Sequence, residues 1–182
     1  MSILSIKKNF IKKEILKIIF SNFLKFHIDI MDFSYVNNIS FCIKEIKKNY
    51  FFLKKIKDII IEFHFMTKFI KNYKNKINHI ENNKYKKTYI ALGNNFCWNY
   101  FLFLKKNILI MSVNPGFGNQ FFLKKTKYYF YKNSSIDGGI KKKIFFLIKN
   151  YFNKIIIGSD IIKKKTLKSY FNFNFVKNNY LI

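Results

Sequence analysis

The chain has 182 residues, of which 35 are cationic and 9 acidic, and its formal net charge is +26. All of the cations are lysines, scattered from Lys7 to Lys177 without a long basic block, whereas nucleic-acid-binding proteins concentrate charge on one face and favour arginine. No uninterrupted apolar run approaches the ~18 residues of a membrane span, the N-terminus lacks the pattern of a signal peptide, and Cys42 and Cys97 form no CxxC pair. We therefore expect one cytoplasmic domain over residues 1–182, with no nucleic-acid or membrane partner and a lysine-rich surface that could attract a small anionic substrate.

Short, Ile-rich runs alternate with longer, lysine-studded segments along the chain. Continuous apolar runs of this length are typical of parallel strands that are buried on both faces. The runs that we expect to form strands are, in chain order, residues 2–6, 24–31, 58–66, 77–81, 88–93, 107–113, 133–137 and 153–159. Helix-length segments lie between most of them, including Asn9–Asn22, Asn95–Lys106 and Ile140–Asn150.

This alternation of strands and helices predicts an α/β fold, namely a (β/α)8 TIM barrel, with an open doubly wound sheet as the alternative. One connection is unusual, because only Asn82–Lys87 separates the fourth predicted strand from the fifth. Six residues are too few for a crossover helix, and the whole chain is shorter than most barrels of this kind. We therefore expect a trimmed barrel in which the helix after strand 4 is nearly absent.

Scarce residue types gather where the predicted strands end, which is where TIM barrels carry their active sites. Two of the three histidines and five of the six glycines of the chain fall at these positions. The polar residues at strand ends are His27, Asp29, His64 and Asp137.

In the second predicted strand, His27 and Asp29 are separated by one residue, so both side chains point to the same side of the sheet. With His64 and Asp137 they form a set of two imidazoles and two carboxylates, which suits Zn²⁺, Fe²⁺ or Mn²⁺. Each histidine taken alone could equally be a hydrogen-bonded core residue. Their joint position at strand ends favours a metal, because a cation offsets the cost of burying an unpaired carboxylate.

Glycines and methionines occur at the same predicted rim. Backbone N–H groups bind phosphate only where the chain can approach closely, which glycine permits, and barrels often bind phosphate after strands seven and eight. Here those positions read "DGG" and "IGS", and a third glycine-containing loop, "PGFG", follows strand six. The internal methionines could be core filler or an apolar floor beneath a substrate, and they are Met31, Met66 and Met111.

Seven segments resemble the ribulose-phosphate 3-epimerase family, and they occur in the family's order over nearly the whole chain. The segments are "SIL" (2–4), "HIDIMDFSYVNNISF" (27–41), "FHFM" (63–66), "HIE" (79–81), "MSVNPGFGNQFF" (111–122), "IDGGI" (136–140) and "IIIGSDII" (155–162). The most specific is "VNPGFGNQ", which in the family is a mobile loop that folds over a bound sugar phosphate.

The resemblance implies an isomerase of the pentose phosphate pathway that interconverts D-ribulose 5-phosphate and D-xylulose 5-phosphate by epimerisation at C3. It implies two acid/base residues, Asp29 and Asp137, acting through an enediolate that one divalent ion (Zn, Fe, Mn or Co) stabilises. The implied metal ligands are His27, Asp29, His64 and Asp137. The implied contacts to the phosphorylated ketose are Ser2, His64, Gly116, Phe117, Gly118, Asn119, Asp137, Gly138, Gly139, Gly158 and Ser159.

The sequence departs from the family in places, and two other interpretations stay open. Phe33 and Asn119 stand where the family has glycine, and the missing fourth helix would expose apolar surface that a homo-oligomer could cover. One alternative is a 3-epimerase of a hexulose phosphate such as allulose 6-phosphate. The other, of a different class, is a degenerate basic protein that binds nucleic acid or serves as a scaffold, although intact Asp29 and Asp137 argue against decay.

Overall fold

The structure is a computed structural model of the chain, and it describes residues 2–6, 8–20, 24–40, 59–68, 79–80, 89–93, 108–129 and 134–164. The predicted helix over 95–106 and the short connection over 82–87 lie outside the described residues. The trimming of the fourth helix therefore stays a prediction. No helix in the described ranges is long and apolar enough to span a membrane.

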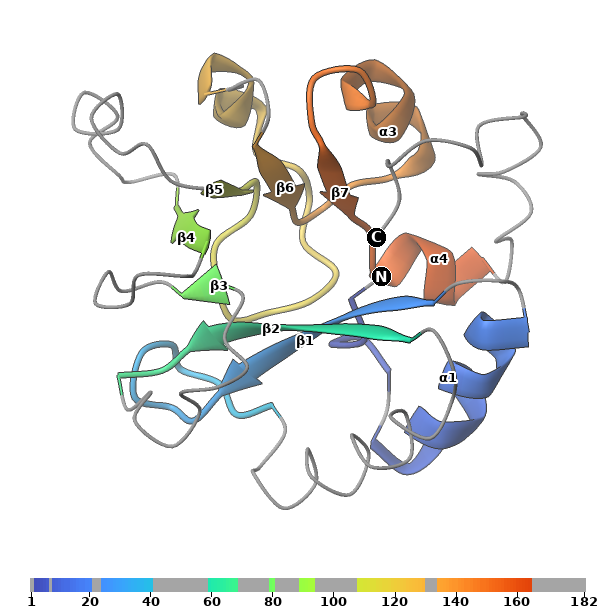
Figure 1. Cartoon of the computed structure of the whole chain (residues 1–182). Helices are drawn as coiled ribbons and strands as arrows, with labels where there is room; N and C mark the ends of the chain where they lie inside the picture. The colour runs from blue at the N-terminus through green and yellow to red at the C-terminus, as the bar shows by residue number, and fades with distance from the viewer. Residues whose placement is uncertain are drawn as a thin grey trace.

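Seven parallel strands form one sheet in which each strand pairs with the next along the chain. The strands are β1 (Lys25–Met31), β2 (Ile60–Met66), β3 (His79–Ile80), β4 (Tyr89–Leu92), β5 (Ile108–Met111), β6 (Ser135–Asp137) and β7 (Lys154–Ile156). All seven lie within runs that the sequence predicts as strands. In Figure 1 the sheet curves round, so that β7 comes to lie near the N-terminal residues and β1.

The prediction of a first strand over residues 2–6 is wrong except at Ser2. Only Ser2 pairs as a strand residue, in a parallel bridge with His27, and the chain then turns, with Ile6 N donating to Ile3 O (3.0 Å). These first residues nevertheless bond to both edge strands of the sheet. Ser2 N donates to the carbonyl of Ile157 just after β7 (3.0 Å), and Ile3 N donates to the carbonyl of His27 in β1 (3.2 Å).

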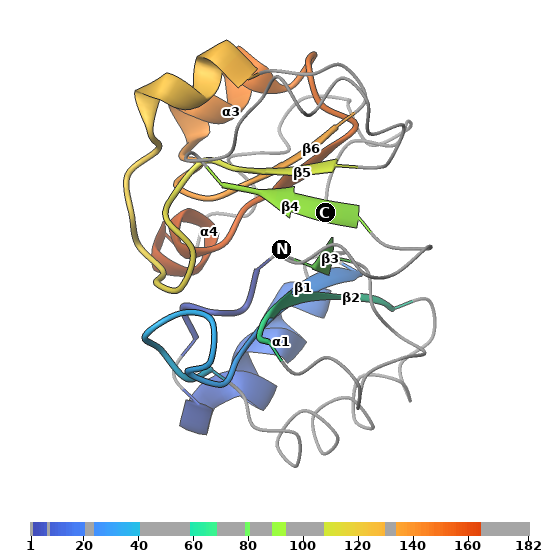
Figure 2. The same cartoon turned by 90° about the vertical axis from the view of Figure 1, so that its left-hand side faces the viewer.

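Helices cover the outer side of the sheet, as Figure 2 shows for α1 beneath β1 and β2 and for α3 above β6. The helices are α1 (Ile11–Phe20), α3 (Lys142–Ile148) and α4 (Ser159–Lys164), with short 3-10 helices η1 (Lys8–Phe10) and η4 (Lys124–Tyr129). In α1 the buried residues recur at helical spacing, namely Ile11, Ile15 and Ile18, which places one apolar stripe against the sheet. The helices α1 and α3 confirm two of the predicted helical segments.

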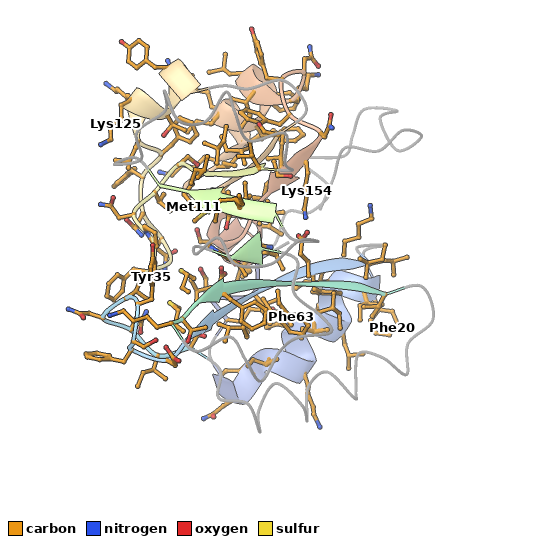
Figure 3. All side chains as sticks on the ribbon, turned by 60° about the vertical axis from the view of Figure 1, so that its left-hand side comes forward. Phe20, Tyr35, Phe63, Met111, Lys125 and Lys154 are labelled. Carbon is orange, nitrogen blue, oxygen red and sulfur yellow. The ribbon has the colours of Figure 1, made fainter. Side chains whose placement is uncertain are left out.

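Alternate residues along each strand point to opposite sides of the sheet, and the two sides have different cores. The outer side contributes Phe26, Phe63 and Ile155 to the large core beneath the helices, and Figure 3 shows Phe63 on the α1 side of β2. The inner side holds a small apolar cluster of Ala91, Leu109, Met111 and Ile156. Its remaining positions on β1, β2, β6 and β7 are largely polar, so a polar site can form on the inner side of the sheet.

Candidate metal centre and substrate cavity

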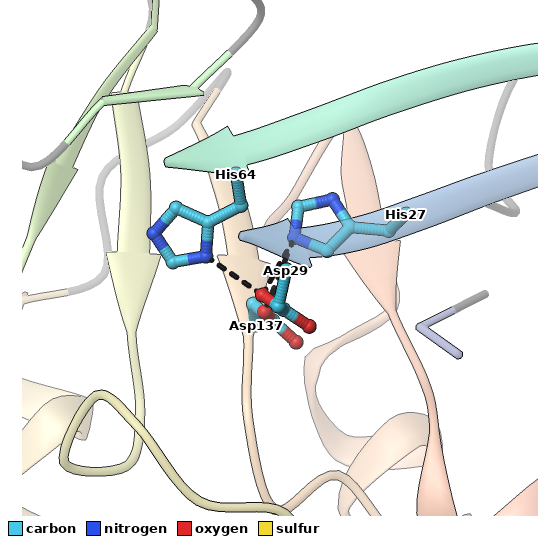
Figure 4. A group of neighbouring side chains, drawn as sticks. All are labelled: His27, Asp29, His64 and Asp137. Atoms are coloured by element: carbon cyan, nitrogen blue, oxygen red, sulfur yellow. Dashed lines mark hydrogen bonds and ion pairs between the residues drawn. The ribbon is translucent and has the colours of Figure 1, made fainter. Parts of the chain in front are cut away.

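Four side chains from three strands converge on the inner side of the sheet. His27 and Asp29 come from β1, His64 from β2 and Asp137 from the end of β6, and one potential ligand atom from each lies within 4.8 Å of all the others. All four residues are buried, and both imidazoles are fully inaccessible to solvent. Figure 4 shows the two rings and the two carboxylates pointing toward one another. The structure thus brings together the four residues that the sequence singles out.

The distances between the polar atoms of this cluster match those of a metal-ligand shell. Asp29 Oδ1 lies 2.9 Å from His64 Nδ1 and 3.5 Å from His27 Nε2, and Asp137 Oδ2 lies 3.6 Å from His27 Nε2. Nitrogen and oxygen ligands lie about 2.0–2.2 Å from zinc, so two ligands of one tetrahedral ion stand about 3.4 Å apart. The set therefore fits a divalent ion that accepts nitrogen and oxygen ligands.

Asp29 and Asp137 have opposite electrostatic environments although both are buried. Burial alone would raise the pKa of Asp29, but hydrogen bonds and charge interactions with His27 and His64 outweigh it and hold this pKa far below its usual value. Burial and, to a smaller extent, the charge of Asp29 raise the pKa of Asp137 to about 6, against the opposing charges of His27 and His64. At neutral pH the metal-free cluster thus holds one firmly ionised carboxylate beside one that readily takes a proton.

Hydrogen bonds from three serines fix the two aspartates, one at the Asp29 carboxylate and the others at the backbone carbonyls. Ser2 Oγ donates to Asp29 Oδ2 (3.0 Å), and Ser40 Oγ donates to the Asp29 carbonyl (2.6 Å) while accepting from Met31 N (2.8 Å). At β6, Ser112 donates from its N–H and its hydroxyl to the Asp137 carbonyl (2.7 and 2.8 Å). Ser40 and Ser112 were not singled out from the sequence, because a serine that closes a strand end has no distinctive pattern.

A second missed feature lies behind His27. Glu62 Oε2 lies 3.2 Å from His27 Nδ1, and its other oxygen is ion-paired with Lys154 of β7. Burial lowers the pKa of Lys154, and the charge of Glu62 opposes this effect. Glu62 is two residues before His64 on β2, so the strand alternation that joins His27 to Asp29 also places Glu62 on the inner side. That signal was available in the sequence, whereas the pairing with Lys154, 92 residues away, was not.

A cavity opens beside the four-residue cluster, and its empty space, including the open mouth, is about 570 Å³. Asp29 and Asp137 line it, while His27 and His64 lie behind them and do not. Of the predicted floor residues, Met66 and Met111 line the cavity, and Met31 is buried but does not. All of the other predicted substrate contacts line it, namely Ser2, Gly116, Phe117, Gly118, Asn119, Gly138, Gly139, Gly158 and Ser159.

The glycines of the cavity are required by close contacts and by backbone conformation. Gly138 and Gly139 have φ values of 110° and 62°, and a Cβ at Gly139 would lie 2.5 Å from the backbone N of Phe122. The loop after β5, drawn in yellow in Figure 1, passes across the middle of the view. Asn38 Nδ2 donates to the Gly116 carbonyl of this loop, which ties it to the loop after β1.

The two positions where the sequence departs from glycine keep a backbone that glycine favours. Phe33 has φ 69° and Asn119 has φ 62°. Asparagine tolerates this left-handed region, whereas an aromatic residue rarely adopts it. Both loops thus keep their turns, with strain at Phe33.

A family model described as the ribulose-phosphate 3 epimerase family matches residues 1–92. This half of the chain includes His27, Asp29 and His64, whereas Asp137 and the glycine loops after β5, β6 and β7 lie beyond it. No curated protein matches the chain.

Proposed function

The chain belongs to the ribulose-phosphate 3-epimerase family, and on that premise we propose that it epimerises D-ribulose 5-phosphate and D-xylulose 5-phosphate at C3. The observation that carries this proposal is the pair Asp29 and Asp137, which line one cavity from different strands with two imidazoles beside them. Epimerisation removes a proton from one face of a carbon and returns one to the other face, so it requires two acid/base groups around a single site.

The two carboxylates would divide this work according to their environments. Asp29, whose pKa is held low, would accept the C3 proton from one face of the sugar. Asp137, whose pKa is raised to about 6, would donate a proton to the opposite face. In the reverse direction the two residues exchange roles. Carboxylates with separated pKa values are the usual basis of such an assignment.

His27, Asp29, His64 and Asp137 would hold one divalent ion (Zn, Fe, Mn or Co), since their donor types and spacing fit these metals. When bound, the ion would supply positive charge that stabilises the enediolate formed when C3 loses its proton. Both carboxylates would then have a second role besides moving protons. Ser2, through its hydrogen bond to Asp29 Oδ2 (3.0 Å), would fix the direction in which that carboxylate faces the substrate.

The phosphate would bind at the glycine loops that line the cavity after β6 and β7. Gly138, Gly139 and Gly158 leave the backbone uncovered there, and Ser159 adds a hydroxyl. Uncovered N–H groups in turns with positive φ form anion-binding concavities. The loop over residues 114–120 would close over the sugar, because Phe117 in this loop is 56% exposed in the structure and could move over the substrate.

We also propose that the sheet is a trimmed (β/α)8 barrel whose first strand is reduced to residues 2–3. The support is that this short segment bonds to β1 on one side and to the end of β7 on the other. We further propose that residues 1–182 form a single domain. The partner of its site would be a phosphorylated ketose.

Turnover of ribulose 5-phosphate and allulose 6-phosphate by the same purified protein, with each candidate metal in turn, tests this function. We expect epimerisation of the pentulose phosphate to be favoured in kcat/KM. A clear preference for the hexulose phosphate would change the substrate, and absence of both activities with every metal would refute the proposal.

A further inference from the structure

Glu62 and Lys154 form a buried ion pair across the inner side of the sheet, next to the cluster but outside it. Glu62 is 5% exposed and Lys154 is 7% exposed, and they come from β2 and β7, which are not neighbours in the sheet. Figure 3 shows Lys154 pointing from β7 toward β2. The pair does not line the cavity, so it is not placed to contact substrate.

Stability alone does not account for this pair. Removing two charges from water costs about as much as their attraction returns, and apolar residues of similar volume often stabilise a protein more. The exposed pair of Glu14 and Lys17 on α1 (2.6 Å) carries no such cost. The buried pair therefore calls for a role that apolar residues could not fill.

The contacts of Glu62 indicate such a role. Glu62 uses one oxygen for Lys154 and the other for His27 Nδ1, 3.2 Å away. An ionised carboxylate only accepts hydrogen bonds, so Nδ1 must carry the proton in this contact. A neutral imidazole then has its lone pair on Nε2, the atom that faces Asp29 and Asp137 at 3.5 and 3.6 Å.

We propose that Glu62 and Lys154 are positioning residues that set the tautomer and ring orientation of His27, so that its Nε2 lone pair points into the proposed metal site. Lys154 holds Glu62 in place through the ion pair, and Glu62 holds the ring through its contact with Nδ1. The proposal rests on the metal site of the proposed function. It extends that function to two residues that touch neither the substrate nor the ion, and partners of this kind commonly change metal affinity about 10–100-fold.

The test compares two double variants that both remove the buried charges. Glu62→Gln/Lys154→Met keeps an oxygen that can accept from His27 Nδ1, whereas Glu62→Leu/Lys154→Met removes it. Glu14→Gln/Lys17→Met, on the exposed pair, controls for the loss of two charges. The chain has only three histidines, so substitutions at His64 and His79 assign the ¹⁵N imidazole signals. The signals are recorded above the pH range in which they titrate, because, although burial opposes this, hydrogen bonds with Asp29 and Glu62 raise the pKa of His27. Co²⁺ affinity is measured on the same proteins by its visible absorption.

We expect the glutamine variant and the control to keep the Nδ1–H tautomer of His27 and to bind Co²⁺ within about threefold of the parent. The leucine variant should shift the tautomer and bind Co²⁺ about 10–100-fold more weakly. A folded leucine variant with the parental tautomer and affinity would overturn the proposal. If the parent binds no Co²⁺, the metal site of the proposed function is refuted, while the tautomer comparison still decides whether Glu62 positions His27.

Discussion

At the scale of single residues, the site depends on two carboxylates that share a cavity but differ in their partners. Asp29 contacts His64 at 2.9 Å and His27 at 3.5 Å, while Asp137 contacts His27 at 3.6 Å. The charge of Asp29 is thereby stabilised, and Asp137 is left beside a like charge. The same residue type consequently has a lowered pKa at one position and a raised pKa at the other.

Replacing either carboxylate by its amide should abolish catalysis without unfolding the protein. Asp29→Asn and Asp137→Asn each remove one proton-transfer group and one proposed metal ligand. We expect kcat/KM for ribulose 5-phosphate to fall by at least about 10²–10⁴-fold. Circular dichroism checks the fold, and Glu14→Gln on α1 serves as a charge control. Near-parental turnover by either variant would contradict the two-carboxylate mechanism.

The stability of the metal-free protein should depend on pH through Asp137. Its pKa is raised from 3.8 to about 6, so its contribution to stability is complete below about pH 4 and is lost as pH rises through 6. Asp137→Asn has no carboxyl group at this position, so the variant does not lose this stability as pH rises. The variant should therefore gain in free energy of unfolding, relative to the parent, between pH 4 and pH 7, as measured by urea denaturation in the presence of a chelator.

Addition of Zn²⁺ at pH 7 should raise the free energy of unfolding of the parent more than that of Asp137→Asn, because the parent keeps all four proposed ligands and the variant does not. A parent-to-variant difference that stays constant from pH 4 to pH 7 would show that Asp137 is not the titrating group.

Their positions on predicted strands made the four cluster residues predictable, because alternation along each strand and the order of the strands place them on one side of a parallel sheet. The contacts among them were not predictable in the same way. Ser40 and Lys154 reach the site through tertiary packing, and no spacing in the sequence marks a serine or a lysine for such a role.

At the scale of elements, the loops at the strand ends show why glycine was expected at certain positions. Phe33 and Asn119 adopt φ 69° and 62°, which side chains other than glycine and asparagine rarely do. The sequence pattern located these turns correctly. It could not show that the backbone keeps its conformation when glycine is replaced.

Phe33→Gly should stabilise the protein, since it relieves a left-handed conformation that costs about 1–2 kcal/mol and Phe33 is 59% exposed. The greater freedom of glycine in the unfolded chain offsets part of this gain. We expect a net gain of about 0.5–1 kcal/mol in the free energy of unfolding. Asn119→Gly, the matched control, should change it by less. Destabilisation by Phe33→Gly would mean that the ring makes contacts that outweigh the strain.

Gly139, in the loop after β6, allows the converse substitution, in which a side chain replaces a glycine. Gly139→Ala would place a Cβ 2.5 Å from Phe122 N at φ 62°, so the backbone must shift at the proposed phosphate site. We expect a higher KM for the sugar phosphate and a loss of stability of about 1–3 kcal/mol. Gly93→Ala is the control, because a Cβ there has nothing within 4 Å in the described part of the chain. Equal effects of the two substitutions would contradict the claim that the backbone conformation and close contacts at Gly139 require glycine.

At the scale of the whole molecule, the site joins two halves of the chain. The family match covers residues 1–92, and this half contributes β1 to β4. The other half contributes Asp137 and the glycine loops, and the strand order brings both to one cavity. The alternation of strands predicted the parallel arrangement. It could not predict that the first strand would shrink to a bridge at Ser2, because "SILSI" has the composition of a full strand.

Exchange of the C3 proton tests the central claim most directly. Ribulose 5-phosphate is incubated with the protein and Zn²⁺, Fe²⁺, Mn²⁺ or Co²⁺ in D₂O, and C3 is followed by NMR. If Asp29 and Asp137 act on opposite faces of that carbon, deuterium enters at C3 as xylulose 5-phosphate forms, and both changes stop in Asp29→Asn. A C3 proton that persists with every metal, in protein that is folded, would contradict the account.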